Sequence, residues 1–200
     1  LNLNYYFKYI MNIKTTPFKE VYILKPNVHL DERGFFMESF NEREFEKALE
    51  RKIKFCQDNL TYSKKGVLRG LHYQLPPFSQ TKLVQVLQGS VLDVLVDIRK
   101  GSPTFGHHFS CELSAENQLQ LYIPRGFAHG YITLSETSIF IYKVDQFYNF
   151  ESEGSITAND PDLGIDWQLP QSEWIQSKKD KKHPKLSEAL LFDYNTDLYA

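Results

Sequence analysis

The fold class is decided by the stretch KLVQVLQGSVLDVLVDI, residues 82–98. Two runs rich in Val and Leu, residues 82–87 and 90–98, are separated by Gln88-Gly89, a pair that favours a turn. Each run is too short for a membrane span and has the composition of a β-strand. The stretch therefore predicts two strands joined by a tight turn.

Similar runs recur on both sides of this pair. Short apolar or β-branched segments are separated by turn residues such as Lys100-Gly101-Ser102-Pro103 and Pro124-Arg125-Gly126. The further expected strands are residues 21–24, 35–40, 67–68, 108–113, 118–123, 132–134 and 138–143. Strands at this near-regular spacing indicate an antiparallel sandwich or barrel, and we predict an all-β jelly-roll barrel with a few short peripheral helices.

Two segments are expected to be helical. From Asn41 to Lys52, apolar residues fall at i, i+3 and i+4 behind Asn41 as a possible N-cap, which predicts one amphipathic helix. Residues 186–191 are expected to form a short final helix. Without a repeat or a low-complexity linker, residues 11–200 are predicted to be a single domain. Residues 1–10 read as a non-native or disordered extension before an initiator at Met11.

The amino-acid composition excludes several classes of protein function. With 200 residues and a formal net charge of −2, the chain has no basic excess that would attract nucleic acid or an acidic membrane. Cys56 and Cys111 lie outside any metal-ligand spacing and are expected to be buried, reduced thiols. No apolar run approaches the roughly 20 residues that span a bilayer, and no signal peptide is evident. These features predict a cytoplasmic enzyme that binds neither nucleic acid nor membrane.

Two histidines lie within strand-like patterns and are candidate site residues. His129 follows Pro124 in a Pro-x-Gly-x-x-His spacing that resembles the second motif of the cupin superfamily. The first cupin motif normally supplies a His-x-His pair and a Glu, but His72 is followed by Tyr73 and Gln74. Because a transition-metal site generally needs three protein ligands, we predict chemistry without a metal.

Several longer blocks of the chain closely resemble the dTDP-4-dehydrorhamnose 3,5-epimerase family of the cupin superfamily. The resemblance covers about Ile13 to Asp180. Its blocks are residues 31–36, 57–59, 66–74, 93–106, 113–117, 123–130 and 160–167. It implies a cupin-like jelly roll and a cofactor-free isomerase that epimerises carbons 3 and 5 of a dTDP-4-dehydro-6-deoxy-glucose substrate to dTDP-4-dehydro-rhamnose. It also implies a homodimer.

Epimerisation next to a ketone needs a base, a group that stabilises the enolate, and an acid on the opposite face. The resemblance implies His72 as the base and Asp180 as its carboxylate partner. It assigns Lys82 to the enolate oxygen and Tyr142 to the acid. The substrate-binding residues that it implies are Arg33, Glu38, Gln57, Asn59, Arg69, His129 and Glu153. Arginine grips diphosphate oxygens with a planar fork, so Arg33 and Arg69 are the expected diphosphate ligands.

Three of the candidate catalytic residues also have a structural interpretation that involves no catalysis. His72 alone would more often be a structural histidine, Tyr142 a core tyrosine, and Lys82 a solvated charge at a sheet edge. Other functions also stay open. One is a single-site epimerase acting at carbon 3 or 5 only. Another is a metal-dependent or sugar-binding cupin that uses His72 and His129 as ligands or contacts.

Overall fold

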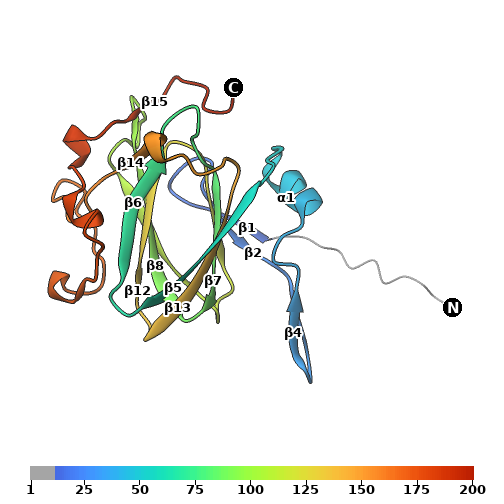
Figure 1. The fold of residues 1–200 in the computed structure, drawn as a ribbon. Helices are drawn as coiled ribbons and strands as arrows, with labels where there is room; N and C mark the ends of the chain where they lie inside the picture. The colour runs from blue at the N-terminus through green and yellow to red at the C-terminus, as the bar shows by residue number, and fades with distance from the viewer. Residues whose placement is uncertain (1–11) are drawn as a thin grey trace.

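The computed structural model describes residues 12–200 and consists mainly of two antiparallel sheets packed face to face (Figure 1). The first sheet has six strands in the order β1-β2-β11-β7-β13-β5 and the second has five in the order β10-β8-β12-β6-β14. The six strands are Asn12–Thr15, Tyr22–Lys25, Gln120–Ile123, Lys82–Gln88, Thr137–Val144 and Gln57–Lys64. The five strands are His108–Ser114, Ser90–Asp97, Phe127–Thr133, Leu68–Gln74 and Glu153–Ser155.

The space between the sheets is filled by apolar side chains from both. Val84 of β7 and Phe140 of β13 meet Leu95 of β8 and Phe127 of β12 in one buried cluster. Because side chains alternate across a strand, polar residues placed in register with these core positions also point into the barrel. This arrangement confirms the predicted jelly roll and lets strands of both sheets direct polar side chains inward.

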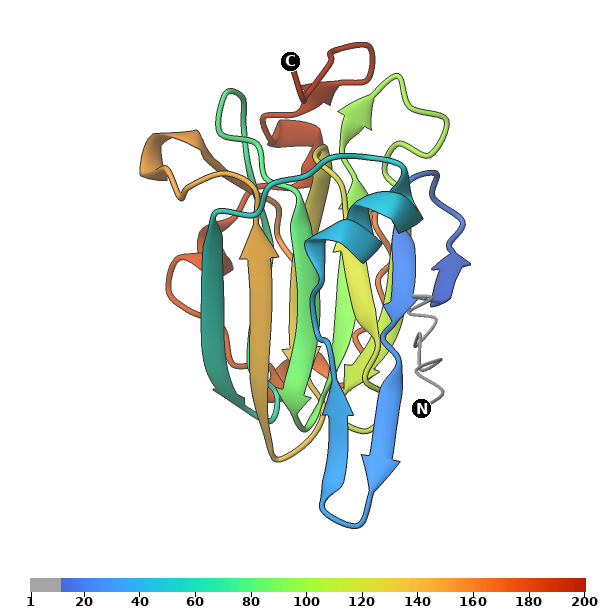
Figure 2. The same ribbon diagram turned by 90° about the vertical axis from the view of Figure 1, so that its right-hand side faces the viewer.

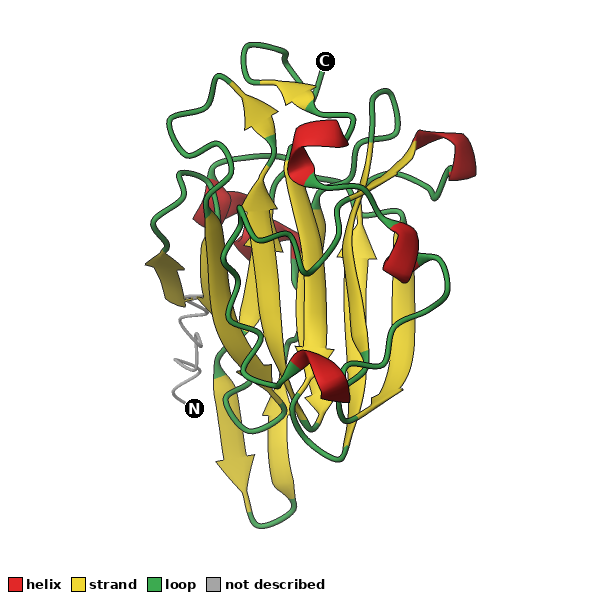
Figure 3. Ribbon diagram, turned by 90° about the vertical axis from the view of Figure 1, so that its left-hand side faces the viewer, coloured by secondary structure: helices red, strands yellow, loops and turns green. Residues whose placement is uncertain are grey.

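The outer face of the five-stranded sheet is covered by the C-terminal segment, as Figure 3 shows. Val94 and Ile132 of the sheet pack against Trp167, Leu186 and Phe192 of that segment in a second buried cluster. The segment carries short 3-10 turns at Gln171–Glu173, Asp180–Lys182 and Leu186–Glu188, and a fourth such turn, Phe150–Ser152, precedes β14. The C-terminal strand β15, Phe192–Asp193, pairs in parallel with β9, Arg99–Lys100. The C-terminal segment therefore lies against the β6 strand that carries His72.

The predicted amphipathic helix is present as α1, Glu42–Leu49. The Asn41 side chain accepts a hydrogen bond from the Glu44 backbone N–H, and Phe45 is buried against the barrel. A hairpin of β3, Val28–Asp31, and β4, Gly34–Met37, precedes the helix. Figures 1 and 2 show this hairpin projecting beyond the body of the barrel.

Several expectations need correction. Residues 186–191 form only the 3-10 turn Leu186–Glu188, because the Leu186, Glu188 and Ala189 backbone N–H groups bond to a carboxylate or to i−3 carbonyls. Strand β12 begins at Phe127, directly after its turn, and not at residue 132. Cys56 is exposed and Cys111 half-buried, so the expected burial of both thiols is wrong, although both are free. The prediction for residues 1–10 and Met11 lies outside the described residues.

None of the helices within residues 12–200 has both the length and the apolar composition that crossing a bilayer would require.

Candidate active site

A cavity of about 310 Å³ opens at one end of the barrel and gathers seven of the eleven candidate site residues. Strands β6, β7, β12, β13 and β14 all supply side chains to its wall. The candidates that line the cavity are Arg69, His72, Lys82, His129, Tyr142, Glu153 and Asp180. Pockets that bind small ligands start at about this size and combine apolar walls with a few polar groups.

Two glycines let β6 and β12 approach closely beside the two site histidines. A Cβ on Gly70 would lie 2.5 Å from the Gly130 Cα, and a Cβ on Gly130 would lie 2.6 Å from the Arg69 carbonyl oxygen. The register places His72 directly opposite His129 and is irregular just beyond that pair. Gly70 and Gly130 therefore set the spacing of the strands that carry both imidazoles.

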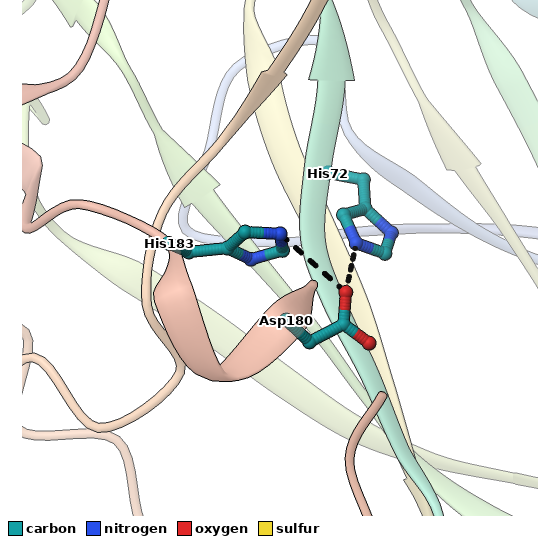
Figure 4. Close-up of side chains that lie close together, drawn as sticks. All are labelled: His72, Asp180 and His183. Atoms are coloured by element: carbon teal, nitrogen blue, oxygen red, sulfur yellow. Dashed lines mark hydrogen bonds and ion pairs between the residues drawn. The ribbon is translucent and has the colours of Figure 1, made fainter. Parts of the chain in front are cut away.

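His72 and Asp180 form a hydrogen-bonded pair at the wall of the cavity (Figure 4). Nε2 of His72 lies 2.8 Å from Oδ1 of Asp180, and Ser177 Oγ accepts a hydrogen bond from the Asp180 backbone N–H. Burial acts to raise the pKa of Asp180. The hydrogen bond from His72 is the largest of the effects that outweigh burial and hold the pKa below its usual value. An ionised carboxylate only accepts hydrogen bonds, so Nε2 of His72 is the donor, and in the neutral form of the ring the lone pair is on Nδ1.

Lys82 is buried at the start of β7, with only 8% of its surface exposed. Its Nζ donates to the backbone carbonyl of His72 at 3.4 Å. Burial lowers the pKa of Lys82 to about 8, although the charges of Asp93 and Glu153 oppose this shift. The position is therefore not the solvated sheet edge that Lys82 would occupy as an ordinary surface charge.

Tyr142 points into the cavity from β13, next to the buried rings of Phe140 and Tyr131. Burial raises the pKa of the Tyr142 phenol, and the effect of Tyr131 adds to it, while Arg69 opposes it. The hydroxyl group is consequently protonated at neutral pH and can donate.

His129 is held by a carboxylate that the sequence did not single out as a site residue. Its Nε2 lies 3.0 Å from both carboxylate oxygens of Asp93, which is fully buried on β8. Burial lowers the pKa of His129, and Asp93 opposes this shift only in part. Because Nε2 is engaged with Asp93, only Nδ1 of His129 is available to a ligand.

Glu153 and Arg69 form the rim of the cavity. Glu153 accepts from the Tyr148 hydroxyl at 2.9 Å and from Lys179 Nζ at 2.5 Å, so its charge is already balanced. Arg69 donates through Nε to Ser63 Oγ at 3.2 Å and is otherwise exposed. Arg69 is thus the cavity arginine with free donors for an anion.

The other four candidates lie outside the cavity wall. Gln57 and Asn59 sit on β5, hydrogen-bonded to each other, and Asn59 is in register with Tyr142 on β13. Arg33 lies at the tip of the β3–β4 hairpin with 85% of its side chain exposed and pairs with Asp31. Glu38 accepts a hydrogen bond from Asn41 at the start of α1. Within one chain the structure does not bring these four to the site.

Sequence reasoning missed three neighbours of the site: Asp93, Lys179 and His183. Asp93 lies within a continuous Val/Leu run, where a buried acid is itself a signal that a partner exists. Lys179 and His183 flank Asp180 in a stretch that reads as a solvated charged loop. Only the folding of this segment onto β6 shows that His183 packs against the His72 ring.

Comparison with known proteins identifies the family to which the chain belongs. A family model described as dTDP-4-dehydrorhamnose 3,5-epimerase matches residues 15–188. A Shigella flexneri protein named dTDP-4-dehydrorhamnose 3,5-epimerase is 50% identical over 182 residues, which cover 91% of this chain and 99% of the relative.

Two similar solved structures support the same family. The enzyme of the same name from Elizabethkingia anophelis is 52% identical with a TM-score of 0.85, over 88% of this chain and 97% of its own. A dTDP-6-deoxy-D-glucose-3,5-epimerase from Legionella pneumophila, in complex with dTDP-4-keto-L-rhamnose, is 47% identical with a TM-score of 0.89, over 93% and 100%. With its cupin-like jelly roll, this chain belongs to the dTDP-4-dehydrorhamnose 3,5-epimerase family of isomerases.

Proposed function

We propose that this protein epimerises carbons 3 and 5 of dTDP-4-dehydro-6-deoxy-D-glucose, giving dTDP-4-dehydro-L-rhamnose without a cofactor. Membership of the family supports the reaction. The observation that carries the mechanism is the convergence of His72, Asp180, Lys82 and Tyr142 on one cavity. These four residue types supply a base with its partner, a cation and an acid, which are the roles that the reaction needs.

His72 acts as the base in this proposal. The hydrogen bond from Nε2 to Asp180 leaves the Nδ1 lone pair to take the proton from the carbon beside the ketone. As the imidazole becomes positively charged, the Asp180 carboxylate stabilises it. Asp180 thereby fixes the ring orientation and favours proton abstraction.

Lys82 stabilises the enolate that forms when the proton leaves. Its ammonium group is held by the His72 carbonyl inside the barrel, where a charge acts more strongly than in water. The three remaining cavity candidates contribute to substrate binding. Arg69 contacts the diphosphate, and His129 and Glu153 contact polar groups of the substrate.

Tyr142 returns a proton to the opposite face of the enolate. Tyr142→Phe removes that proton donor but leaves the base in place, so we expect deuterium exchange from heavy water into the substrate without inversion of configuration. Proton NMR of the recovered nucleotide sugar measures exchange and configuration separately. Normal inversion by the phenylalanine variant would contradict the role of Tyr142.

Identification of the product tests the overall reaction. The wild-type protein is incubated with dTDP-4-dehydro-6-deoxy-D-glucose, and the ring couplings of the product are read by proton NMR. We expect inversion at both carbons. Inversion at one carbon would identify a single-site epimerase, and an unchanged substrate would favour a sugar-binding or metal-dependent cupin.

We further infer a homodimer in which the β3–β4 hairpin docks onto a second copy of the chain. The hairpin exposes Leu30 at 81%, Phe35 at 57% and Phe36 at 61% of their surfaces, and such apolar patches typically mark interfaces. Docking would bring Arg33 and Glu38 to the partner's cavity, which explains why neither reaches the cavity of its own chain.

The paired substitution Phe35→Ser and Phe36→Ser is expected to yield a monomer by light scattering. Leu190→Ser changes an equally exposed apolar residue outside the hairpin and serves as the control. A dimer that persists in the paired variant would contradict this interface.

We propose the cytoplasm as the compartment of the reaction.

A further inference from the structure

A second histidine lies against the His72–Asp180 pair and has no role in the proposed reaction. His183 follows the 3-10 turn Asp180–Lys182, and its ring packs edge-on against His72 at 5.2 Å between centroids. Only 4% of its side chain is exposed. Neither ring nitrogen has a hydrogen-bond partner among the described residues.

A buried imidazole without hydrogen bonds is unusual, because the loss of hydration is then not compensated. Oδ1 of Asp180 lies 3.5 Å from His183 Nε2, which is too long for a good hydrogen bond. Figure 4 shows both imidazoles directed at the same carboxylate oxygen. Burial lowers the pKa of His183, so the ring is neutral at pH 7.

Two imidazoles and one carboxylate make a donor set suited to a divalent transition metal. The three side chains each offer one ligand atom, and these atoms all lie within 4.8 Å of one another. Tetrahedral zinc with bonds of about 2.0–2.2 Å separates its ligands by about 3.3–3.5 Å. The His183–Asp180 distance of 3.5 Å already matches, and a small rotation of His72, whose side chain is 32% exposed, adjusts the other two distances.

We propose that His72, Asp180 and His183 bind a divalent transition-metal ion of the Zn²⁺ class, and that this ion inhibits the enzyme. The ion replaces the hydrogen bond between His72 and Asp180 by bonding to Nε2 of His72 and Oδ1 of Asp180. The proton of the His72 ring then moves to Nδ1, so the lone pair that would attack the substrate is lost.

Metal binding is tested directly on the full-length protein. Co²⁺ is titrated as a spectroscopic probe, and its visible absorption distinguishes four-coordinate binding from the hydrated ion, while calorimetry gives the Zn²⁺ affinity. His183→Gln removes one of the three ligands and is expected to weaken Zn²⁺ binding by about 10–100-fold. His107→Gln and Cys56→Ser, at exposed positions away from the cavity, should bind Zn²⁺ as the wild type does.

Inhibition is measured separately, because it rests on the proposed role of His72. Zn²⁺ should inhibit the wild type reversibly with EDTA, and a 10–100-fold higher concentration should be needed for His183→Gln, each compared with its own zinc-free rate. Equal Zn²⁺ affinity in wild type and His183→Gln, or loss of binding only in Cys56→Ser, would overturn the site. Tight binding without inhibition would refute the inhibitory part alone.

Discussion

His72→Gln is expected to lower kcat by about 10²–10⁴-fold, the range typical for loss of a general base. The glutamine amide nitrogen can take the place of Nε2 and donate to Asp180, so the pocket keeps its shape while the basic lone pair is removed. Substrate binding should change little, because the proposal assigns His72 to proton abstraction rather than to binding. Initial rates by NMR and the Kd for dTDP by calorimetry separate these two effects.

The matched control is His107→Gln, which alters an exposed histidine outside the cavity and should keep the wild-type rate. If His72→Gln retained more than about a tenth of the wild-type kcat, His72 would not be the base.

Lys82→Met is expected to reduce kcat by about 10²–10³-fold, as when one preorganised enolate-stabilising donor is lost. Methionine has a similar length and no charge, so it fits the buried position at the start of β7. Thermal unfolding should show a folded variant, because a buried ammonium group is costly to stability and the buried Asp93 carboxylate keeps its hydrogen bonds to His129. Wild-type kcat in this variant would exclude Lys82 from catalysis.

The wild-type pH profile provides a second test of Lys82. Its pKa is lowered to about 8, and the charged form is the active one in the mechanism. The charged fraction falls as pH rises through 8, so kcat should decline above that pH. In Lys82→Met, the residual rate should lack this decline.

Much of the barrel could be predicted from the sequence because strand alternation and turn residues are local signals. Strands β7 and β8 follow from their Val/Leu runs and the intervening Gln88-Gly89. The start of β12 could not be predicted in this way, since Phe127-Ala128-His129-Gly130 has weak β-propensity and is a strand only through its pairing with β6 and β8. The 3-10 turn at Leu186–Glu188 likewise depends on a long-range bond from Leu186 to Asp160.

The candidate site could likewise be predicted only in part from the sequence. The block Arg69-Gly70-Leu71-His72 supports a family resemblance, but the contact between His72 and Asp180 joins residues 108 positions apart. His183 has no local signal at all, because its surroundings in sequence are charged and its burial results from packing onto β6.

The measurement that tests the central claim most directly is turnover in heavy water, followed by mass spectrometry and NMR of the product. Proton abstraction at both carbons beside the ketone, followed by return of solvent protons, predicts deuterium at carbon 3 and at carbon 5 with the wild-type protein. Product or recovered substrate with no deuterium at either carbon would contradict the epimerase mechanism.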